Sequence, residues 1–179
     1  MRSLRFNRPM PVLMFLAFLA VVGTVCTPSA LAQKGCAALY LPAGPENGNF
    51  ITGVWNAEGP AFLGKEELYV KITVQDLGFS TVGKKGNTAK GTEIAAYDFG
   101  NGNKFQTSIA YVVEHNNDPD KFYLNAVETI IPGSGTGRFA NATGTLTTHG
   151  DFGVSDWVSM DGWAIFTTHG SVCGAGSAS

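Results

Sequence analysis

Charged residues are scarce in this sequence of 179 residues. Only 15% of its residues are Asp, Glu, Lys or Arg, with 12 basic and 14 acidic side chains, whereas 44% are hydrophobic. A chain with so little charge and so much apolar content is expected to fold around a core rather than to remain disordered. Its acidic balance is opposite to that of proteins that bind phosphate backbones, so we expect no nucleic-acid partner.

The sequence signatures of several reaction classes are also missing. There is no Gly-x-Ser-x-Gly nucleophile elbow. The glycine-rich run from Gly133 to Gly137 is followed by Arg138 and Phe139, whereas a phosphate-binding loop needs a following Lys-Ser or Lys-Thr and a helix. We therefore expect neither a nucleotide nor another cofactor.

The N-terminal region has the pattern of a removable export signal. Arg2, Arg5 and Arg8 precede an uncharged stretch whose most apolar part is Met10–Val25. This part is shorter than the roughly 20 residues that a membrane-spanning helix needs. An uncleaved N-terminal anchor is the alternative interpretation.

Small residues mark the expected cleavage site. Ala30 and Ala32 fit a signal-peptidase site before Gln33. We therefore predict a signal peptide over residues 1–32 and a single mature domain over residues 33–179. The mature protein would be secreted or periplasmic, with no membrane attachment after cleavage.

Cysteine is rare as well, with three residues in the whole chain. Cys26 falls within the predicted signal, which leaves Cys36 and Cys173. An exported chain with two cysteines most simply forms one disulfide, and its Cα atoms must lie within about 7 Å. The chain-entropy model gives about 5 kcal/mol for such a long loop. Two free thiols or a metal-binding pair are the alternatives.

No window after Gln33 has apolar residues at helical spacing for three turns, so we expect no long helix. Alternation of apolar and polar residues is clear instead. Leu68, Val70 and Ile72, for example, share one face of an extended segment. Alternation and turn residues predict strands at 49–55, 67–74, 92–99, 104–115, 121–131, 145–149 and 155–168.

The predicted strands follow one another at hairpin-like distances. Consecutive antiparallel strands with linked ends favour an all-β fold, an antiparallel closed barrel of about eight strands, because closure removes exposed sheet edges. A two-sheet β-sandwich is the alternative. We expect irregular chain at Leu41–Phe50 and Leu77–Gly91, and a turn at Gly150–Gly153.

The most distinctive motif runs from Ile130 to Thr147 and reads IIPGSGTGRFANATGTLT. Its glycines permit a tight reversal after a strand, and Phe139 is placed to plug the end of a barrel. The motif resembles the Gly-Gly-Thr-Gly-x-Phe…Ala-x-Gly signature of allene oxide cyclase and dirigent-like barrels, especially their exported bacterial members. Ser134 and Asn141 depart from that pattern. The resemblance implies an eight-stranded barrel with a central cavity.

Glu128 is the strongest candidate for a catalytic residue. It is the one acidic residue on a strand face that it shares with Leu124 and Ile130. If that face lines a cavity, burial would raise the pKa of the carboxyl group and suit it to proton transfer. The alternative is that this face meets solvent or a neighbouring element.

Four further residues are candidates for ligand binding. Asp161 and Trp163 share a phase on the last predicted strand. Tyr111 and Tyr123 could add hydroxyl donors at the mouth of a pocket. Each of them has an alternative role, either in packing or on the solvated surface.

The histidines do not predict a metal site. His149 and His169 lie in two copies of a Thr-Thr-His-Gly repeat. If their strands are antiparallel neighbours and the histidines lie at strand ends, the two imidazoles fall at opposite rims. We therefore expect no bound metal.

Three functions remain open for such a barrel. The leading hypothesis is an exported β-barrel that binds a small apolar ligand in its central cavity. The alternatives are a cyclase or isomerase-type enzyme like those that the resemblance suggests, and a non-catalytic structural or interaction module. The sequence leaves the oligomeric state open.

Overall fold

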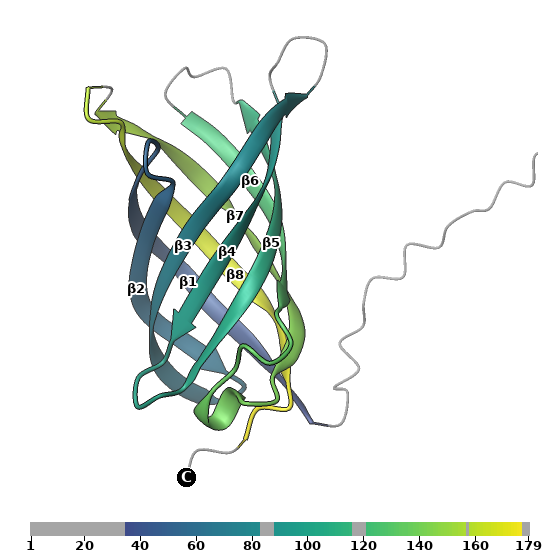
Figure 1. Ribbon diagram of the computed structural model, residues 1–179. Coiled ribbons are helices and arrows are strands. Elements are labelled where there is room, and N and C mark those ends of the chain that lie inside the picture. The colour runs from purple at the N-terminus through teal and green to yellow at the C-terminus, as the bar shows by residue number, and fades with distance from the viewer. Residues whose placement is uncertain (1–34, 83–87, 116–120, 157, 177–179) are drawn as a thin grey trace, which may run out of the picture. The chain divides into compact units, whose positions relative to one another are not determined.

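Eight β-strands close into one barrel in the computed structural model, which describes residues 35–82, 88–115, 121–156 and 158–176. Each strand pairs antiparallel with the next, and β8 pairs with β1 to complete the ring (Figure 1). The predicted barrel is confirmed, and the β-sandwich alternative is wrong. The predicted signal, residues 1–32, lies outside the described residues. The strands are β1 (Cys36–Asn49), β2 (Val54–Leu63), β3 (Glu66–Val82), β4 (Thr88–Asp98), β5 (Lys104–His115), β6 (Lys121–Ile130), β7 (Thr143–Asp156) and β8 (Asp161–Cys173).

Alternation along each strand decides which side chains face the interior. In β5, Phe105, Thr107 and Ile109 are buried, and the residues between them are exposed. In β6, Leu124 and Glu128 are buried in the same way. The faces predicted for these two strands are therefore the inner faces of the barrel.

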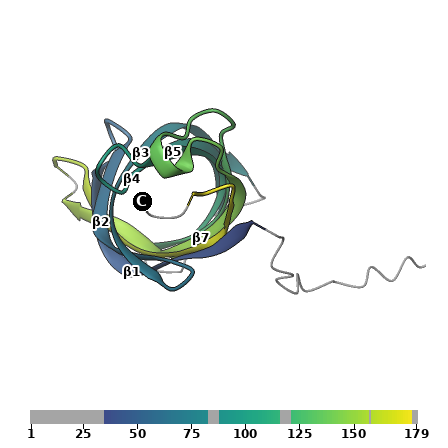
Figure 2. The ribbon, with the colours of Figure 1, turned by 90° about the horizontal axis from the view of Figure 1, so that it is seen from below.

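A plug of aromatic side chains fills one end of the barrel. The chain reverses there through the 3₁₀-helix η1 (Gly137–Phe139), which lies at the lower end of the barrel in Figure 1 and at the opening that faces the viewer in Figure 2. Gly137 has a φ of 58°, which favours glycine. This conformation directs Phe139 inward, where its ring centroid lies 4.9 Å from that of Phe99 and 5.2 Å from that of Phe105. Phe139 is fully buried, as the motif predicted.

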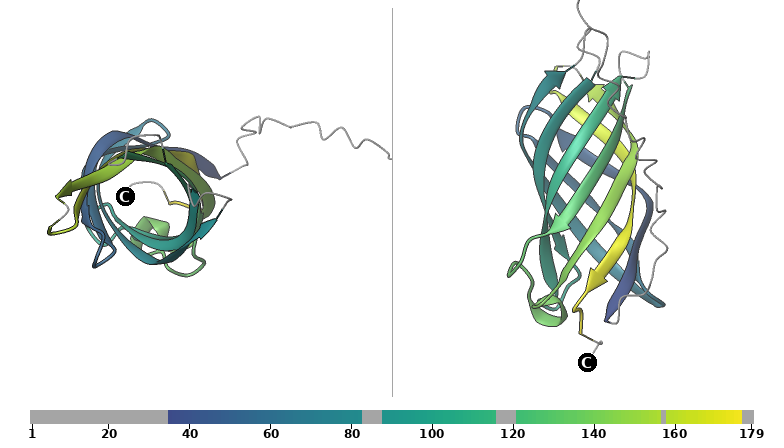
Figure 3. Two further views of the ribbon diagram at one scale, coloured as in Figure 1. Left: turned by 90° about the horizontal axis from the view of Figure 1, so that it is seen from above. Right: turned by 90° about the vertical axis from the view of Figure 1, so that its right-hand side faces the viewer.

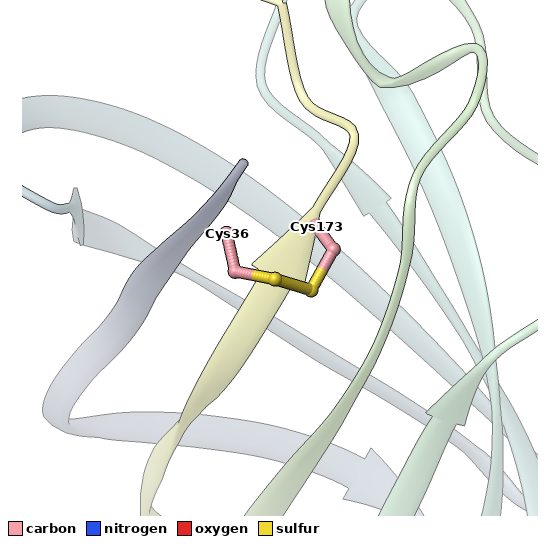
Figure 4. Close-up of a disulfide and its surroundings, with 2 residues drawn as sticks. All are labelled: Cys36 and Cys173. Carbon is pink, nitrogen blue, oxygen red and sulfur yellow. A yellow bond between two sulfur atoms is a disulfide. The ribbon is translucent and has the colours of Figure 1, made fainter. Parts of the chain in front are cut away.

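The disulfide joins the first and last strands at this same end. Cys36 and Cys173 are directly paired in the register between β1 and β8, and their Sγ atoms are bonded (Figure 4). Their Cα atoms are 3.8 Å apart, within the predicted limit. The predicted pairing is confirmed. It indicates folding in an oxidising compartment.

The first strand was missed by the sequence pattern. All but the last residue of Leu41–Phe50, expected to be irregular, belongs to β1, and the expected strand at 49–55 spans the turn between β1 and β2. Alternation fails here because the β1–β8 register shifts between Leu41 and Gly44, next to Pro42. Pairing on both sides holds the segment extended regardless.

Glycines also misled the prediction of turns. Gly150–Gly153, expected to be a turn, lies within β7, and the expected strand at 155–168 contains the turn before β8. A Cβ atom at Gly150 would overlap the main-chain oxygen of Ile165, so this glycine permits close approach of two strands. Leu77–Gly91, also expected to be irregular, belongs to β3 up to Val82 and to β4 from Thr88.

No helix among the described residues is long and apolar enough to cross a membrane.

Candidate functional site

A cavity of about 580 Å³ occupies the barrel interior away from the aromatic plug. All eight strands contribute to its wall, and most of the lining side chains are apolar. Its outer part is bordered by residues at the strand ends opposite the disulfide, such as Phe50, Thr88 and His115. Figure 3 (left) looks along the barrel axis from this end. The volume lies within the range of about 300–1,000 Å³ that is typical of small-molecule pockets.

Aromatic rings surround the outer part of the cavity. Trp55 meets Phe50 edge to face, with ring centroids 5.1 Å apart, and meets Phe152 with centroids 6.2 Å apart. Phe152 also stacks on Phe122 at 5.2 Å. Glycines at positions 48 and 162 leave the space that the Trp55 ring occupies. The rings offer a ligand a broad apolar surface.

The inner part of the cavity is built around Glu128, which is only 2% exposed. The hydroxyls of Tyr97 and Thr107 each donate a hydrogen bond of 2.8 Å to its Oε2 atom. Thr148 donates to Oε1. Because Thr148 uses its only proton there, the Thr168 hydroxyl, 2.7 Å away, must donate to Thr148. Three hydroxyl groups thus donate to one carboxylate, and a fourth donates to one of these three.

This network also affects the phenol of Tyr97. Burial, followed by the negative charge of Glu128, raises the pKa of Tyr97 well above its usual value. Tyr97 therefore stays protonated and acts as a hydrogen-bond donor. The result is a rigid, charge-assisted cluster on the cavity wall.

Further carboxyl groups line the wall nearer the open end. Burial raises the pKa of Glu46 to about 7, and the charge of Glu128 adds to the effect. Burial likewise raises the pKa of Glu93 to about 8, with added repulsion from Asp76, Glu46 and Glu128. The Tyr111 hydroxyl donates to Asp76 over 3.4 Å, and burial raises the pKa of Tyr111.

Two of the five predicted site residues line the cavity. Glu128 lies at the centre of the hydroxyl cluster, and Tyr111 lines the wall beside Asp76. Whether either binds a ligand or acts in catalysis stays a prediction. The residues whose hydroxyls donate to Glu128, Tyr97, Thr107 and Thr148, were not among the predicted site residues.

The other three predicted residues, Tyr123, Asp161 and Trp163, do not line the cavity. Tyr123 alternates with the lining residues of β6, and Trp163 alternates with buried Gly162 and Ala164. Gly162 and Ala164 occupy the inner face of β8 at this point, so the side chain of Trp163 lies on the outer face. Asp161 is exposed and accepts hydrogen bonds from Asn49 and Ser159, which lower its pKa.

The expected separation of His149 and His169 was also wrong. Both lie within paired strands, where Thr147 pairs with His169 and His149 pairs with Thr167. Their ring centroids are consequently only 5.7 Å apart, at diagonal positions on the outer face. Among the described residues, no group of three or more His, Cys, Asp or Glu side chains is placed to hold a metal ion.

Comparison with known proteins leaves the chain without an assigned family. No protein-family model, curated protein or solved structure matches it. The relation to allene oxide cyclase and dirigent-like barrels therefore stays a prediction from the motif around Gly133–Gly144. The chemistry of the site follows from this chain's own cavity, its aromatic border and its carboxyl groups.

Proposed function

We propose that this protein is an exported β-barrel that binds one small molecule with an apolar body in its central cavity. The observation that carries the proposal is the cavity itself, about 580 Å³ in volume and lined mainly by apolar side chains. A barrel that served only as a structural module would gain stability by filling that space with side chains. The volume therefore favours binding over a purely structural role.

Export is the second part of the proposal. The signal pattern of residues 1–32 and the disulfide between Cys36 and Cys173 both support a secreted or periplasmic location. N-terminal sequencing of the exported protein should give Gln33 as the first residue. A mature protein that retains its N-terminal arginines would contradict this.

Kinship with the allene oxide cyclase and dirigent-like barrels is proposed on two grounds. The fold has eight antiparallel strands in a closed ring, as the resemblance implies. The glycine-rich turn sets Phe139 into the barrel end, which gives the motif a structural role in this chain.

Binding in the cavity can be tested with N-phenyl-1-naphthylamine, an uncharged fluorescent probe of suitable size. We expect saturable enhancement of its fluorescence at one site per chain. Ala126 lines the cavity, and Ala126→Phe should weaken probe binding about tenfold or more by occupying the space. The matched control Ala110→Phe adds the same ring on the exposed face of β5.

The outcomes of this titration separate the alternatives. Loss of affinity in Ala126→Phe, with Ala110→Phe unchanged, supports binding inside the barrel. Equal affinity in both variants, or no saturable binding by the wild type, overturns it. Ala89→Phe, nearer the open end, serves as a second inward variant if Ala126→Phe does not fold.

A cyclase or isomerase is the second candidate function. It is favoured by the convergence of Tyr97, Thr107 and Thr148 on the buried carboxylate of Glu128. Such a cluster could orient a reactive substrate and supply an acid or base. If the protein accelerates cyclisation of an allene oxide generated in situ, Glu128→Gln should lower that rate about 10²-fold. No acceleration by the wild type would remove this candidate.

A further inference from the structure

The cavity wall carries several acidic side chains and no lysine or arginine among the described lining residues. Its four carboxyl groups are those of Glu46, Asp76, Glu93 and Glu128. Two of the four have polar partners within the protein. Glu128 accepts from three hydroxyls, and Asp76 accepts from the Gly78 N–H and from Tyr111.

Glu46 and Glu93 differ because neither has a hydrogen bond or ion pair with a described residue. Glu46 lies on β1, opposite β5 in the ring, so it faces Glu93 and Glu128 across the interior. Glu93 pairs with Asp76 in the adjacent strand, and Ile109 alone separates it from Glu128 in the register. Two unpartnered carboxyl groups are thus directed into an apolar space from opposite sides.

Ionisation of several carboxyl groups in an apolar cavity is unfavourable when no positive charge lies near them. Desolvation and mutual repulsion both oppose ionisation, and they raise the pKa of Glu46 to about 7 and that of Glu93 to about 8. A cation inside the cavity would reverse both effects. Its attraction would be strong because the surroundings are poorly solvated.

We propose that the ligand is an organic amine: an apolar body that carries one protonated nitrogen, held between Glu46 and Glu93. This inference rests on the proposed function and names its ligand class. The apolar body would lie against Trp55, Phe50 and Phe152, whose π-faces also attract a cation. A carboxylate-bearing ligand of the same shape would be repelled.

Affinity for such a ligand should depend on pH through Glu46 and Glu93. Raising the pH ionises Glu46 and then Glu93, so amine binding strengthens from about pH 5 to about pH 8. β2, β7 and β8 add no titratable side chain to the described lining. The full set is Glu46 on β1, Asp76 on β3, Glu93 and Tyr97 on β4, Tyr111 and His115 on β5, and Glu128 on β6.

The test compares two probes of nearly equal shape by isothermal titration calorimetry. 4-Phenylbutylamine is protonated at pH 8, and 4-phenylbutan-1-ol is neutral. We expect the amine to bind at least about tenfold more tightly than the alcohol at pH 8. At pH 5, where both acids are protonated, the difference should fall to about threefold or less.

A double variant assigns the preference to these two residues. Glu46→Gln with Glu93→Gln should lower amine affinity at pH 8 about tenfold, towards that of the alcohol. The matched control is Glu67→Gln, which removes one carboxylate from the exposed face of β3. It should leave the preference for the amine unchanged.

The results distinguish this inference from the proposed function. Equal affinity for amine and alcohol at pH 8, or an amine preference that survives the double variant, overturns the amine inference and leaves apolar binding standing. Binding of N-phenyl-1-naphthylamine without binding of the amine does the same. Failure of all three probes overturns the proposed function as well.

Discussion

At the disulfide end of the barrel, inward aromatic side chains pack against one another, whereas at the opposite end they border open space. Phe139 is fully buried against Phe99 and Phe105. Phe50 and Phe152 are only partly buried and line the cavity. Both ends are therefore rich in aromatics, but only one uses them as core. The difference separates the part that stabilises the barrel from the part available to a ligand.

Polar groups follow the same division. Glu128, deeper in the interior, has all its hydrogen bonds made by hydroxyls of the protein. Glu46 and Glu93, nearer the open end, have no such partners and show raised pKa values. A carboxylate whose hydrogen bonds all come from the protein contributes to structure. A carboxyl group without such partners is available to bind a ligand or a proton.

The largest expected effect concerns the disulfide at the closed end. Replacing both Cys36 and Cys173 by Ser should lower the free energy of unfolding by about 5 kcal/mol, because the chain without the cross-link gains loop entropy when unfolded. Guanidinium denaturation under non-reducing conditions measures the loss. A double variant as stable as the wild type would show that the closed end does not depend on this cross-link.

Truncating the plug gives the next largest effect. Phe139→Ala should cost about 3–5 kcal/mol because it leaves a cavity among packed rings. Phe152→Ala at the open end is the matched control and should cost about 1 kcal/mol, since that ring already borders space. Similar losses in the two variants, measured by chemical denaturation, would break the contrast between the ends.

The unsatisfied acids should make stability fall as the pH rises. The folded protein keeps protons on Glu46 and Glu93 up to about pH 7 and pH 8, whereas the unfolded chain releases them near the ordinary value of 4.5. The free energy of unfolding should therefore decrease steadily between about pH 5 and pH 8. Denaturation curves across this range measure the slope.

The matched variant identifies the groups that cause this slope. In Glu46→Gln with Glu93→Gln, neither position binds or releases a proton, so stability should be nearly constant between pH 5 and pH 8. A wild type that becomes more stable over the same range would contradict the assignment.

The smallest effect is expected at Glu128. In Glu128→Gln, the amide oxygen can accept from Tyr97 and Thr107, and the amide nitrogen can donate to Thr148, whose hydroxyl then turns towards Thr168. The free energy of unfolding should change by less than about 1 kcal/mol. Glu128→Leu, which leaves three hydroxyls without an acceptor, should lose about 3 kcal/mol or more.

The barrel could be predicted from the sequence because most strands alternate strictly and follow one another closely. β5 shows this best, since Phe105, Ile109 and Tyr111 share the inner face. β1 could not be predicted, because its prolines and the register shift hide the alternation that pairing with two neighbours imposes. Cys36 nevertheless located its start through the disulfide.

The site was only partly predictable because phase gives two faces without saying which is inside. On β6 the apolar residues around Glu128 decided the matter correctly. On β8 the large side chain of Trp163 suggested the wrong face, since the inner positions hold small residues such as Gly162 and Ala164. Tyr97 and Glu93 share the inner phase of β4 with Ala95, so alternation along this strand indicates that both face the interior.

The central claim is that a ligand binds in the open half of the barrel interior. Nuclear magnetic resonance of the isotope-labelled protein, titrated with N-phenyl-1-naphthylamine, tests this claim most directly. The indole N–H signal of Trp55, which lines the cavity, should shift, and that of Trp163 on the outer face should not. Backbone signals of Ala126 and Phe152 should also shift, while those of Phe139 in the plug stay fixed. Shifts confined to the outer face or to the plug would contradict binding in the cavity.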